Sequence, residues 1–259
     1  MIDETERRRL LEAARDAARA AGAAILEIYA GDFAVRQKDD RTPVTLADER
    51  AEAIIIAALY RAAPQIPAVA EEEMAAGGAA PHPPERFWLV DPLDGTREFI
   101  RRNGEFTVNI ALVEDGRCAL GVVHVPVTNI TYWGMGLGTA MRQVGDAPPA
   151  GIHARRAPAT GAVVAHSRSH GDSQRVDAYV AGIPGAVRRV SGSSVKFCLI
   201  AAGEADYYPR FGPTMEWDTA AGQAVLEAAG GAVMTLDGAP LRYAKPEFRN
   251  PDFIARGAA

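Results

Sequence analysis

The stretch from Trp88 to Thr96 constrains the fold of this chain more than any other part of its sequence. It reads Trp-Leu-Val-Asp-Pro-Leu-Asp-Gly-Thr, in which an apolar run meets one carboxylate and a second carboxylate follows three residues later. A short apolar run of this kind is typical of a buried strand, and the Gly-Thr pair is typical of a turn that opens a helix. We therefore expect a strand that ends at Asp91, a proline-fixed turn that presents Asp94, and a helix that begins after Gly95.

Two carboxylates this close together repel each other, and a bound cation would relieve the repulsion. Mg²⁺ suits such a site, because it prefers one or two carboxylates together with phosphate oxygens and water. The backbone N–H groups of a helix that begins after Gly95 would bind an anion, phosphate above all. The alternative is an Asx turn with a helix cap, in which Asp94 only accepts hydrogen bonds from backbone amides. The pattern favours the metal site and leaves the alternative open.

Hydrophobic periodicity predicts helices before this stretch and antiparallel strands after it. Apolar residues recur with helical spacing over 10–28 and again from about 46 to 61. Over 106–112 they alternate with polar or small residues, which is typical of a half-buried strand. Asp115-Gly116 would turn that strand back into a hairpin with residues 118–125.

The second half of the sequence alternates between strand and helix patterns. The expected strands lie at 162–165 and 232–235, and the expected helices lie near 173–180, at 193–202 and at 218–229. Between about 135 and 150, glycines and prolines break the periodicity. We therefore expect two lobes, an N-terminal α+β lobe over residues 1–140 and a C-terminal α/β lobe over residues 141–259.

Composition and charge limit what this protein would bind. The 259 residues include 28 basic and 33 acidic side chains, a net charge of −5, and no segment basic enough to grip nucleic acid through its phosphates. The longest strongly apolar stretch, 53–60, is far shorter than the roughly 20 residues that span a bilayer. The two cysteines form no disulfide framework, and the charged start lacks the apolar core of a secretory signal. We expect a cytoplasmic protein, free or peripheral to the inner membrane, with no nucleic-acid partner and no integral membrane segment.

Two separate motifs resemble the signatures of one enzyme superfamily. Val-Asp-Pro-Leu-Asp-Gly-Thr at 90–96 is similar to the signature of the lithium-sensitive, Mg²⁺-dependent phosphatases of the inositol monophosphatase superfamily, and Trp-Asp-Thr-Ala-Ala-Gly at 217–222 is similar to its second signature. Four further stretches resemble the bacterial 3'(2'),5'-bisphosphate nucleotidase branch of that superfamily: residues 97–112, 167–170, 192–199 and 208–214. The resemblance extends from about Thr42 to Asn250.

The resemblance implies a fold and a cofactor. The fold would be α+β, a layered αβαβα sandwich of the sugar-phosphatase type with two lobes, and the cofactor would be two or three Mg²⁺ ions. The residues that match the family's metal ligands are Glu71, Asp91, Leu93 (through its backbone carbonyl), Asp94 and Asp218. Asp48 matches the acid that pairs with Thr96 to orient and deprotonate the attacking water. Glu71 matches the glutamate that bridges the metals, and it joins Asp48 and Thr96 as the third catalytic residue that the resemblance implies.

The same resemblance implies how the substrate is bound. The residues that would contact it are Asp94, Gly95, Thr96, His170, Ser193, Lys196, Arg210 and Asp218. Lys196 would meet a second phosphate, with help from Arg210 and from the nearby Arg168, while His170 would contact the nucleoside. A single lysine on a helix is more often solvated, so this part of the prediction depends on the motif match.

The leading interpretation is a Mg²⁺-dependent phosphatase of sulfur metabolism that removes the 3'-phosphate of adenosine 3',5'-bisphosphate and yields AMP. An enzyme of the same class for inositol-1-phosphate or fructose-1,6-bisphosphate is the first alternative. A catalytically silent phosphate-binding regulatory protein is the second, and the presence of every expected carboxylate together with Thr96 argues against it. The partner would be a small phosphorylated substrate, and the protein would be a monomer or a homodimer.

Overall fold

Two long helices form the first layer of the protein. The structure, a computed structural model, describes residues 3–37, 43–77, 84–168 and 171–259. The two helices are α1 (Glu4–Tyr29) and α2 (Leu46–Ala62). Asp3 begins α1 by accepting a hydrogen bond from the Glu6 N–H at 2.8 Å. The apolar stripe of α1, which includes Leu10, Ala14 and Ile25, is buried in the core that α1 shares with α2 and the first sheet, so both predicted helices are confirmed.

The second layer is a sheet of seven strands in the order β3-β4-β5-β6-β7-β8-β9. Their bounds are β3 (Ala68–Ala70), β4 (Arg86–Asp94), β5 (Thr107–Glu114), β6 (Arg117–Val125), β7 (Ile130–Gly134), β8 (Met141–Val144) and β9 (Ala150–Gly151). Two short helices follow the first two strands: α3 (Glu71–Ala75) and α4 (Thr96–Ile100). Because β3 and β4 run parallel, Glu71 and Thr96 lie at the same edge of the sheet.

Strand β5 is buried on both faces, so the prediction of a half-buried strand is wrong. Val108 and Leu112 belong to the core beneath α1 and α2. Ala111 and Val113 belong to a second core on the other side of the sheet. Helices from the second half of the chain cover that other face, where water would lie in an open sheet. The predicted hairpin between β5 and β6 is confirmed.

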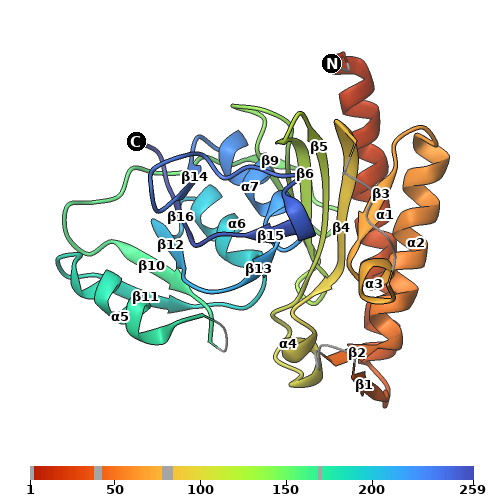
Figure 1. Ribbon diagram of the computed structural model, residues 1–259, viewed down its shortest axis with the longest axis horizontal. Coiled ribbons are helices and arrows are strands. Elements are labelled where there is room, and N and C mark those ends of the chain that lie inside the picture. The colour runs from red at the N-terminus through yellow and green to blue at the C-terminus, as the bar shows by residue number, and fades with distance from the viewer. Residues whose placement is uncertain (1–2, 38–42, 78–83, 169–170) are drawn as a thin grey trace.

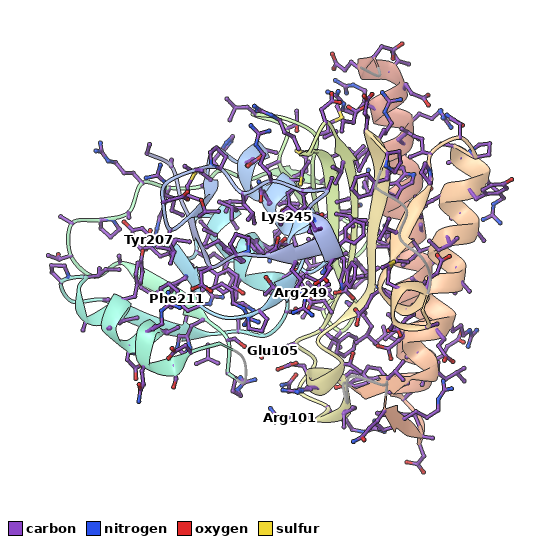
Figure 2. The ribbon with its side chains drawn as sticks, viewed as in Figure 1. Arg101, Glu105, Tyr207, Phe211, Lys245 and Arg249 are labelled. Carbon is purple, nitrogen blue, oxygen red and sulfur yellow. The ribbon has the colours of Figure 1, made fainter. Side chains whose placement is uncertain are left out.

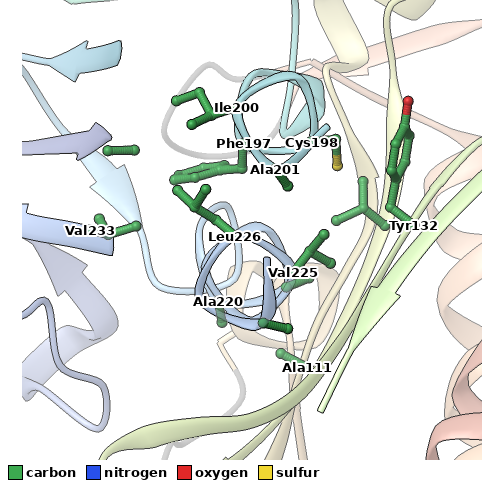
Figure 3. Packing of buried hydrophobic residues seen from close by; sticks show 14 of the residues in the cluster. Ala111, Tyr132, Phe197, Cys198, Ile200, Ala201, Ala220, Val225, Leu226 and Val233 are labelled. Atoms are coloured by element: carbon green, nitrogen blue, oxygen red, sulfur yellow. The ribbon is translucent and has the colours of Figure 1, made fainter. Parts of the chain in front are cut away.

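Two helices form the third layer: α6 (Val195–Ala201) and α7 (Ala220–Ala228). Figure 3 shows them between the two sheets, with Val225 of α7 toward Tyr132 of β7. On the other side of α7, Leu226 lies toward Val233 of the second sheet. Each helix begins two residues later than predicted, because the residues before it form turns that enter the cleft described below.

The fourth layer is a sheet of five strands in the order β11-β10-β12-β16-β14. Their bounds are β11 (Val187–Val190), β10 (Val163–His166), β12 (Tyr207–Arg210), β16 (Phe253–Arg256) and β14 (Ala232–Thr235). The fifth layer, α5 (Ser173–Ala181), packs on the outer face of this sheet through Val176 and Val180. Figure 1 shows the resulting αβαβα order from α1 and α2 on one side to α5 on the other, as predicted.

Short elements complete the chain. Two strand pairs lie outside the large sheets, β1 (Val35–Gln37) with β2 (Pro43–Thr45) and β13 (Thr214–Met215) with β15 (Arg249–Asn250). A single 3₁₀ turn, η1 (Pro246–Phe248), precedes β15. The pairing of β13 with β15 brings the C-terminal part of the chain beside the turn that leads into α7.

The division of the chain at residue 140 stays a prediction. Strands β8 and β9 lie beyond that residue, yet they hydrogen-bond within the seven-stranded sheet, so this sheet extends to Gly151. Helix α7 also packs on β5, β6 and β7. Among the described residues, no helix is both long enough and apolar enough to cross a membrane.

Candidate active site

A cleft of about 510 Å³ lies where the end of β4 meets the turns before α6 and α7. Of the residues predicted for the site, its walls contain Glu71, Asp91, Leu93, Asp94, Gly95, Thr96, Ser193, Lys196, Arg210 and Asp218. They come from segments far apart in the sequence, and Arg249, labelled in Figure 2, joins them from β15. His170 lies outside the described residues, so its predicted contact with the nucleoside stays a prediction.

The two motif carboxylates lie where the pairing of β4 with β5 is irregular. Strand β4 continues to Asp94, beyond the predicted end at Asp91, and the register shifts between the two residues. Asp91 Oδ1 accepts a hydrogen bond from the Leu93 N–H at 3.1 Å, which closes an Asx turn. Asp94 Oδ2 instead accepts from the side chains of Asn109 at 3.3 Å and Ser194 at 2.9 Å. The alternative in which Asp94 binds only backbone amides is therefore wrong.

Thr96 and Asp48, which are expected to act on the attacking water, are in direct contact. The Thr96 hydroxyl donates to Asp48 Oδ1 at 3.0 Å, and the Leu93 carbonyl oxygen is a more distant acceptor at 3.4 Å. Asp48 Oδ2 accepts from the N–H of Thr45 at 2.8 Å and from its hydroxyl at 2.7 Å. These contacts belong to the capping box that begins α2. The cap therefore also holds in place the carboxylate that Thr96 contacts.

Asp218 reaches the cleft from the turn before α7. It does not cap that helix, since Thr219 is the N-cap residue and Asp218 Oδ2 accepts from the Met215 N–H at 2.9 Å. Burial raises the pKa of Asp218 well above its ordinary value, and the negative charges of Asp94 and Glu71 raise that pKa further. Carboxylates from three separate parts of the chain thus repel one another in this cleft.

The donor set of the cleft fits a hard divalent cation in kind. The predicted ligands that line it are Glu71, Asp91, Leu93, Asp94 and Asp218, and carboxylate and carbonyl oxygens are the donors that Mg²⁺ prefers. The repulsion that raises the pKa of Asp218 is the kind that a cation relieves. As they stand, no three His, Cys, Asp or Glu side chains of the described chain converge closely enough to hold a metal ion. The individual ligand roles therefore stay predictions.

Lys196 of α6 brings a cation to the cleft from the second half of the chain. It is 3% exposed, and its ammonium donates to the backbone carbonyls of Ser191 and Ser193. The ammonium also lies 4.9 Å from the centre of the Tyr208 ring. Burial lowers the pKa of Lys196 to about 8, although the negative charge of Asp94 opposes this shift. The lysine is therefore buried at the cleft, where a helix lysine is usually solvated.

Two donors near Lys196 are buried without a hydrogen-bond partner in the described chain. They are Ser193 Oγ and Arg210 Nε. Arg210 is 9% exposed, and its Nη2 donates to the Pro213 carbonyl at 2.8 Å. A buried donor without a partner is costly, so unpaired donors at a cleft indicate a place for a ligand that accepts hydrogen bonds. An anion fits this part of the cleft.

Arg168 connects the two halves of the chain at the edge of this region. Its Nη1 donates to Glu105 Oε2 at 2.9 Å, and the same oxygen accepts from the Gly192 N–H at 3.1 Å. Glu105, labelled in Figure 2, belongs to the segment between α4 and β5. Among the described residues, Arg168 is not one of those that line the cleft, so its predicted share in phosphate binding stays a prediction.

Some residues at or beside the cleft were not predicted from the sequence, among them Ser194, Asn109 and Glu98. Ser194 and Asn109 are buried and hydrogen-bond to Asp94. Glu98 lines the cleft at 2% exposure, and burial raises its pKa. In the sequence Glu98 resembles a solvated helix acid, and Ser194 resembles its neighbour Ser193. Only the folded arrangement shows that Glu98 is buried at the cleft and that Ser194 contacts Asp94.

The sequence model of the inositol monophosphatase family matches residues 6–255 of this chain. The chain belongs to the inositol monophosphatase family. Within the inositol monophosphatase family it is similar to the 3'(2'),5'-bisphosphate nucleotidase CysQ of Shigella flexneri, with 45% identity over 91% of this chain and 95% of that protein. The 3'(2'),5'-bisphosphate nucleotidase CysQ of Escherichia coli K12 is 44% identical over the same shares of the two proteins.

Solved structures of the inositol monophosphatase family share the fold of this chain. The crystal structure of CysQ from Bacteroides thetaiotaomicron is 36% identical and superimposes with a TM-score of 0.80 over 96% of this chain and 97% of that chain. The inositol monophosphatase from Anabaena is 26% identical, with a TM-score of 0.75 over 98% of this chain and 92% of that chain. The predicted family and the predicted sandwich fold are therefore confirmed.

Proposed function

We propose that this protein is a Mg²⁺-dependent phosphatase that converts adenosine 3',5'-bisphosphate to AMP and phosphate. The observation that carries this proposal is a single cleft in which an acidic cluster lies near Lys196 and Arg210. A substrate with two phosphates would place one at each of these two regions. The identity of 45% and 44% to proteins named 3'(2'),5'-bisphosphate nucleotidase supports the same substrate. Membership of a generally Mg²⁺-dependent family supports the cofactor, which we expect as two or three ions.

Hydrolysis of a phosphate monoester needs a water in line with the leaving oxygen and neutralisation of the phosphoryl charge. The Thr96 hydroxyl donates to Asp48, so the lone pairs of Thr96 Oγ are left to accept a proton from the water. As the water attacks, its proton passes to Thr96 Oγ, and the Thr96 proton passes to Asp48 Oδ1. Thr45 keeps that carboxylate in place by donating twice to its other oxygen. Mg²⁺, when bound, lowers the pKa of water and neutralises phosphoryl charge.

The acidic side of the cleft would hold the ions and the phosphate that is cleaved. The residues that would hold Mg²⁺ are Glu71, Asp91, Leu93 through its carbonyl, Asp94 and Asp218. Gly95 and Thr96 follow directly on β4, so the start of α4 would lie next to the cleaved phosphate, between Asp94 and Asp218. The repulsion among the carboxylates supports this role, because only bound cations would let an anionic substrate approach them.

The other side of the cleft would bind the phosphate that is not cleaved. Lys196 supplies a buried cation there, and Ser193 Oγ and Arg210 Nε supply buried donors without a partner in the described chain. A phosphate accepts hydrogen bonds from all three kinds of group. This pocket supports a bisphosphate substrate over inositol-1-phosphate, which has no second phosphate to place in it. The cytoplasmic location and the monomeric or homodimeric state stay predictions.

Release of inorganic phosphate from a substrate panel tests the proposed function. The panel holds adenosine 3',5'-bisphosphate, inositol-1-phosphate and fructose-1,6-bisphosphate, each with and without Mg²⁺. We expect the nucleotide to give the highest kcat/KM, no turnover without Mg²⁺, and inhibition by Li⁺, which approaches Mg²⁺ in size but has half its charge. A preference for either of the other substrates would replace the nucleotide in the proposal. Equal turnover with and without Mg²⁺ would refute the proposal as a whole.

Asp94→Asn is expected to abolish Mg²⁺-dependent activity while the protein stays folded. The substitution removes one negative charge from the predicted cation site and leaves the shape of the side chain unchanged. The matched control is Asp115→Asn in the exposed turn between β5 and β6, where a left-handed φ of 51° suits asparagine as well as aspartate. Activity and circular dichroism of the two variants would be compared, and near-normal turnover by Asp94→Asn would show that Asp94 is not a ligand.

A further inference from the structure

The hydroxyl of Ser194 lies where three segments of the cleft meet. Ser194 is 1% exposed and directly precedes α6. Its Oγ lies 2.9 Å from Asp94 Oδ2, 2.7 Å from the Asp218 backbone carbonyl oxygen and 3.0 Å from Asn109 Nδ2. Asp94 ends β4, Asn109 belongs to β5 and Asp218 precedes α7, so one hydroxyl contacts both halves of the chain.

The donors and acceptors around this hydroxyl determine how Asn109 is oriented. A carboxylate and a backbone carbonyl only accept hydrogen bonds, whereas the amide group of asparagine has two hydrogens to donate. Asn109 Nδ2 lies 3.0 Å from Ser194 Oγ and 3.3 Å from Asp94 Oδ2, so it donates one hydrogen to each. The opposite orientation would place the amide oxygen against the carboxylate oxygen. Ser194 then shares its single hydrogen between Asp94 Oδ2 at 2.9 Å and the Asp218 carbonyl oxygen at 2.7 Å.

These contacts hold one oxygen of Asp94 and leave the other to the cleft. Both donors, from Asn109 and from Ser194, meet at Oδ2. No residue of the described chain donates a hydrogen bond to Oδ1, so that oxygen is left for a ligand that enters the cleft. A carboxylate fixed along one edge presents its second oxygen in a constant direction.

The same contacts set the spacing between two carboxylates that repel each other. Ser194 contacts the side chain of Asp94 and the backbone of Asp218, so it spans the gap between the first sheet and the turn before α7. Both carboxylates line the same cleft, so their negative charges repel each other. A residue that ties them together opposes their separation.

We propose that Ser194 and Asn109 are positioning residues that hold the Asp94 carboxylate at a fixed distance from Asp218, so that these two predicted ligands are oriented before a cation binds. The inference rests on the proposed function, because it concerns the same acidic cluster. Without the pair, a cation must order the Asp94 carboxylate as it binds, and the free energy needed for that ordering weakens the binding of the cation. The expected loss is therefore in metal affinity, and turnover at saturating metal is largely retained.

Titration calorimetry with Mg²⁺ alone tests the positioning role apart from activity. Ser194→Ala removes the hydroxyl, and we expect its Kd for Mg²⁺ to rise at least about tenfold, as for loss of a hydrogen bond to a charged group. The Mg²⁺ concentration for half-maximal activity should rise by the same factor, while kcat at saturating Mg²⁺ stays within about threefold of the wild type. Ser194→Thr keeps a hydroxyl and should recover most of the affinity.

A neighbouring serine provides the matched control. Ser191 is buried in the same turn, and its Oγ donates to the Gly192 carbonyl at 3.4 Å. Ser191→Ala should leave the Kd for Mg²⁺ unchanged, because this hydroxyl contacts neither carboxylate. If Ser194→Ala does not fold, Asn109→Leu provides the same comparison, since it removes both amide hydrogens at similar volume.

The outcomes separate this inference from the proposed function. A folded Ser194→Ala whose Kd for Mg²⁺ is within about twofold of the wild type overturns the positioning role, and so does an equal rise in Ser191→Ala. If the wild type binds Mg²⁺ but releases phosphate from no member of the substrate panel, the phosphatase is refuted while the calorimetry still tests Ser194. A wild type that binds no Mg²⁺ overturns both.

Discussion

At the scale of single residues, Lys196 has a charge in an almost fully buried position. Two backbone carbonyls and the Tyr208 ring surround its ammonium, and only part of the hydration it would have in water is replaced by them. Asp94 supplies the largest opposing charge, and Arg210 adds a like charge. A phosphate bound at this place would accept hydrogen bonds from the Lys196 ammonium and the Arg210 guanidinium and would neutralise their positive charge.

Lys196→Ala is expected to raise KM for adenosine 3',5'-bisphosphate about ten- to hundred-fold, since a charge-assisted contact contributes roughly 1.5–3 kcal/mol. For a nucleoside 3'-monophosphate KM should change little, because the one phosphate of this substrate would lie at the acidic cluster. If the contact is equal in the ground and transition states, kcat barely changes. Steady-state kinetics with both substrates give the ratio of their kcat/KM values. An unchanged ratio would contradict the role of Lys196 and leave the phosphatase itself intact.

The same ratio should fall as the pH rises above about 8 in the wild type. Burial lowers the pKa of Lys196 from 10.5 to about 8, so the free enzyme loses this positive charge well before an ordinary lysine does. Effects of pH on the shared hydrolytic step cancel in the ratio. A flat ratio from pH 6.5 to 9.5 would count against a buried lysine at the second phosphate.

The lowered pKa of Lys196 also affects stability. Between pH 8 and 10.5 the unfolded chain binds more protons at this lysine than the folded one, so the lysine makes the free energy of unfolding rise with pH in that window.

Several residues of the site could be predicted from the sequence, because the motifs carry them. Asp91, Asp94 and Asp218 lie in two recognisable motifs and line one cleft. Ser194 could not be predicted, since its role depends on a hydroxyl that meets Asp94 across 100 positions of sequence. A local pattern contains no information about such a distance, and burial of a polar side chain is visible only when the layers are assembled.

At the scale of elements, α1 and β6 pack closely at Gly22. A Cβ atom at this position would lie 2.6 Å from Cδ2 and 2.7 Å from Nε2 of the His124 ring on β6. Thr131 contacts the other side of that ring, with Oγ1 2.9 Å from His124 Nδ1. Burial lowers the pKa of His124 to about 4, so the ring is neutral at neutral pH and packs as part of the core.

Gly22→Ala is therefore expected to destabilise the protein by about 1–3 kcal/mol, the usual cost of forcing an extra group into a filled core. In the middle of a free helix the same change normally stabilises by roughly 0.5–1 kcal/mol. Gly31→Ala, beyond the end of α1, is the control, because the nearest atom to its added Cβ is 3.9 Å away. Urea denaturation of the two variants gives the comparison. Equal stabilities would mean that α1 and β6 have room to separate.

Helical periodicity was sufficient to predict α1 and α2, because a helix that lies on the surface of a core shows its buried stripe in the sequence. It was not sufficient for β5. Alternation reports which residues point to the same side, but it does not tell whether the opposite side meets water or another layer. Ala111 and Val113 meet α7 and its neighbours, and those helices lie about a hundred residues later in the chain.

At the scale of the whole molecule, the seven-stranded sheet is enclosed by helices from both ends of the chain. α1 and α2 precede all of its strands, whereas α6 and α7 follow all of them. The core between the sheet and α7 includes Val123, Tyr132 and Val225. The second half of the chain therefore completes the core on one face of this sheet, in addition to its part in the cleft.

A fragment of residues 1–151, which contains every strand of the seven-stranded sheet, is expected not to fold by itself. Without α7 it would expose the apolar face around Ala111, Val123 and Tyr132. Near-ultraviolet circular dichroism should show no fixed aromatic packing, and the fragment should bind a hydrophobic dye. Cooperative unfolding with a native-like near-ultraviolet spectrum would instead support lobes that fold independently, with the division near residue 140.

The position of α7 along the chain also has a consequence in time. A ribosome completes β9 before it begins α6 and α7, and at about 5–20 residues per second the delay is on the order of ten seconds. During that interval the first sheet can pair its strands and receive α1 and α2, but its second face has nothing to cover it. The nascent chain therefore carries an exposed apolar surface late in its synthesis, until the helix that follows Asp218 covers that face.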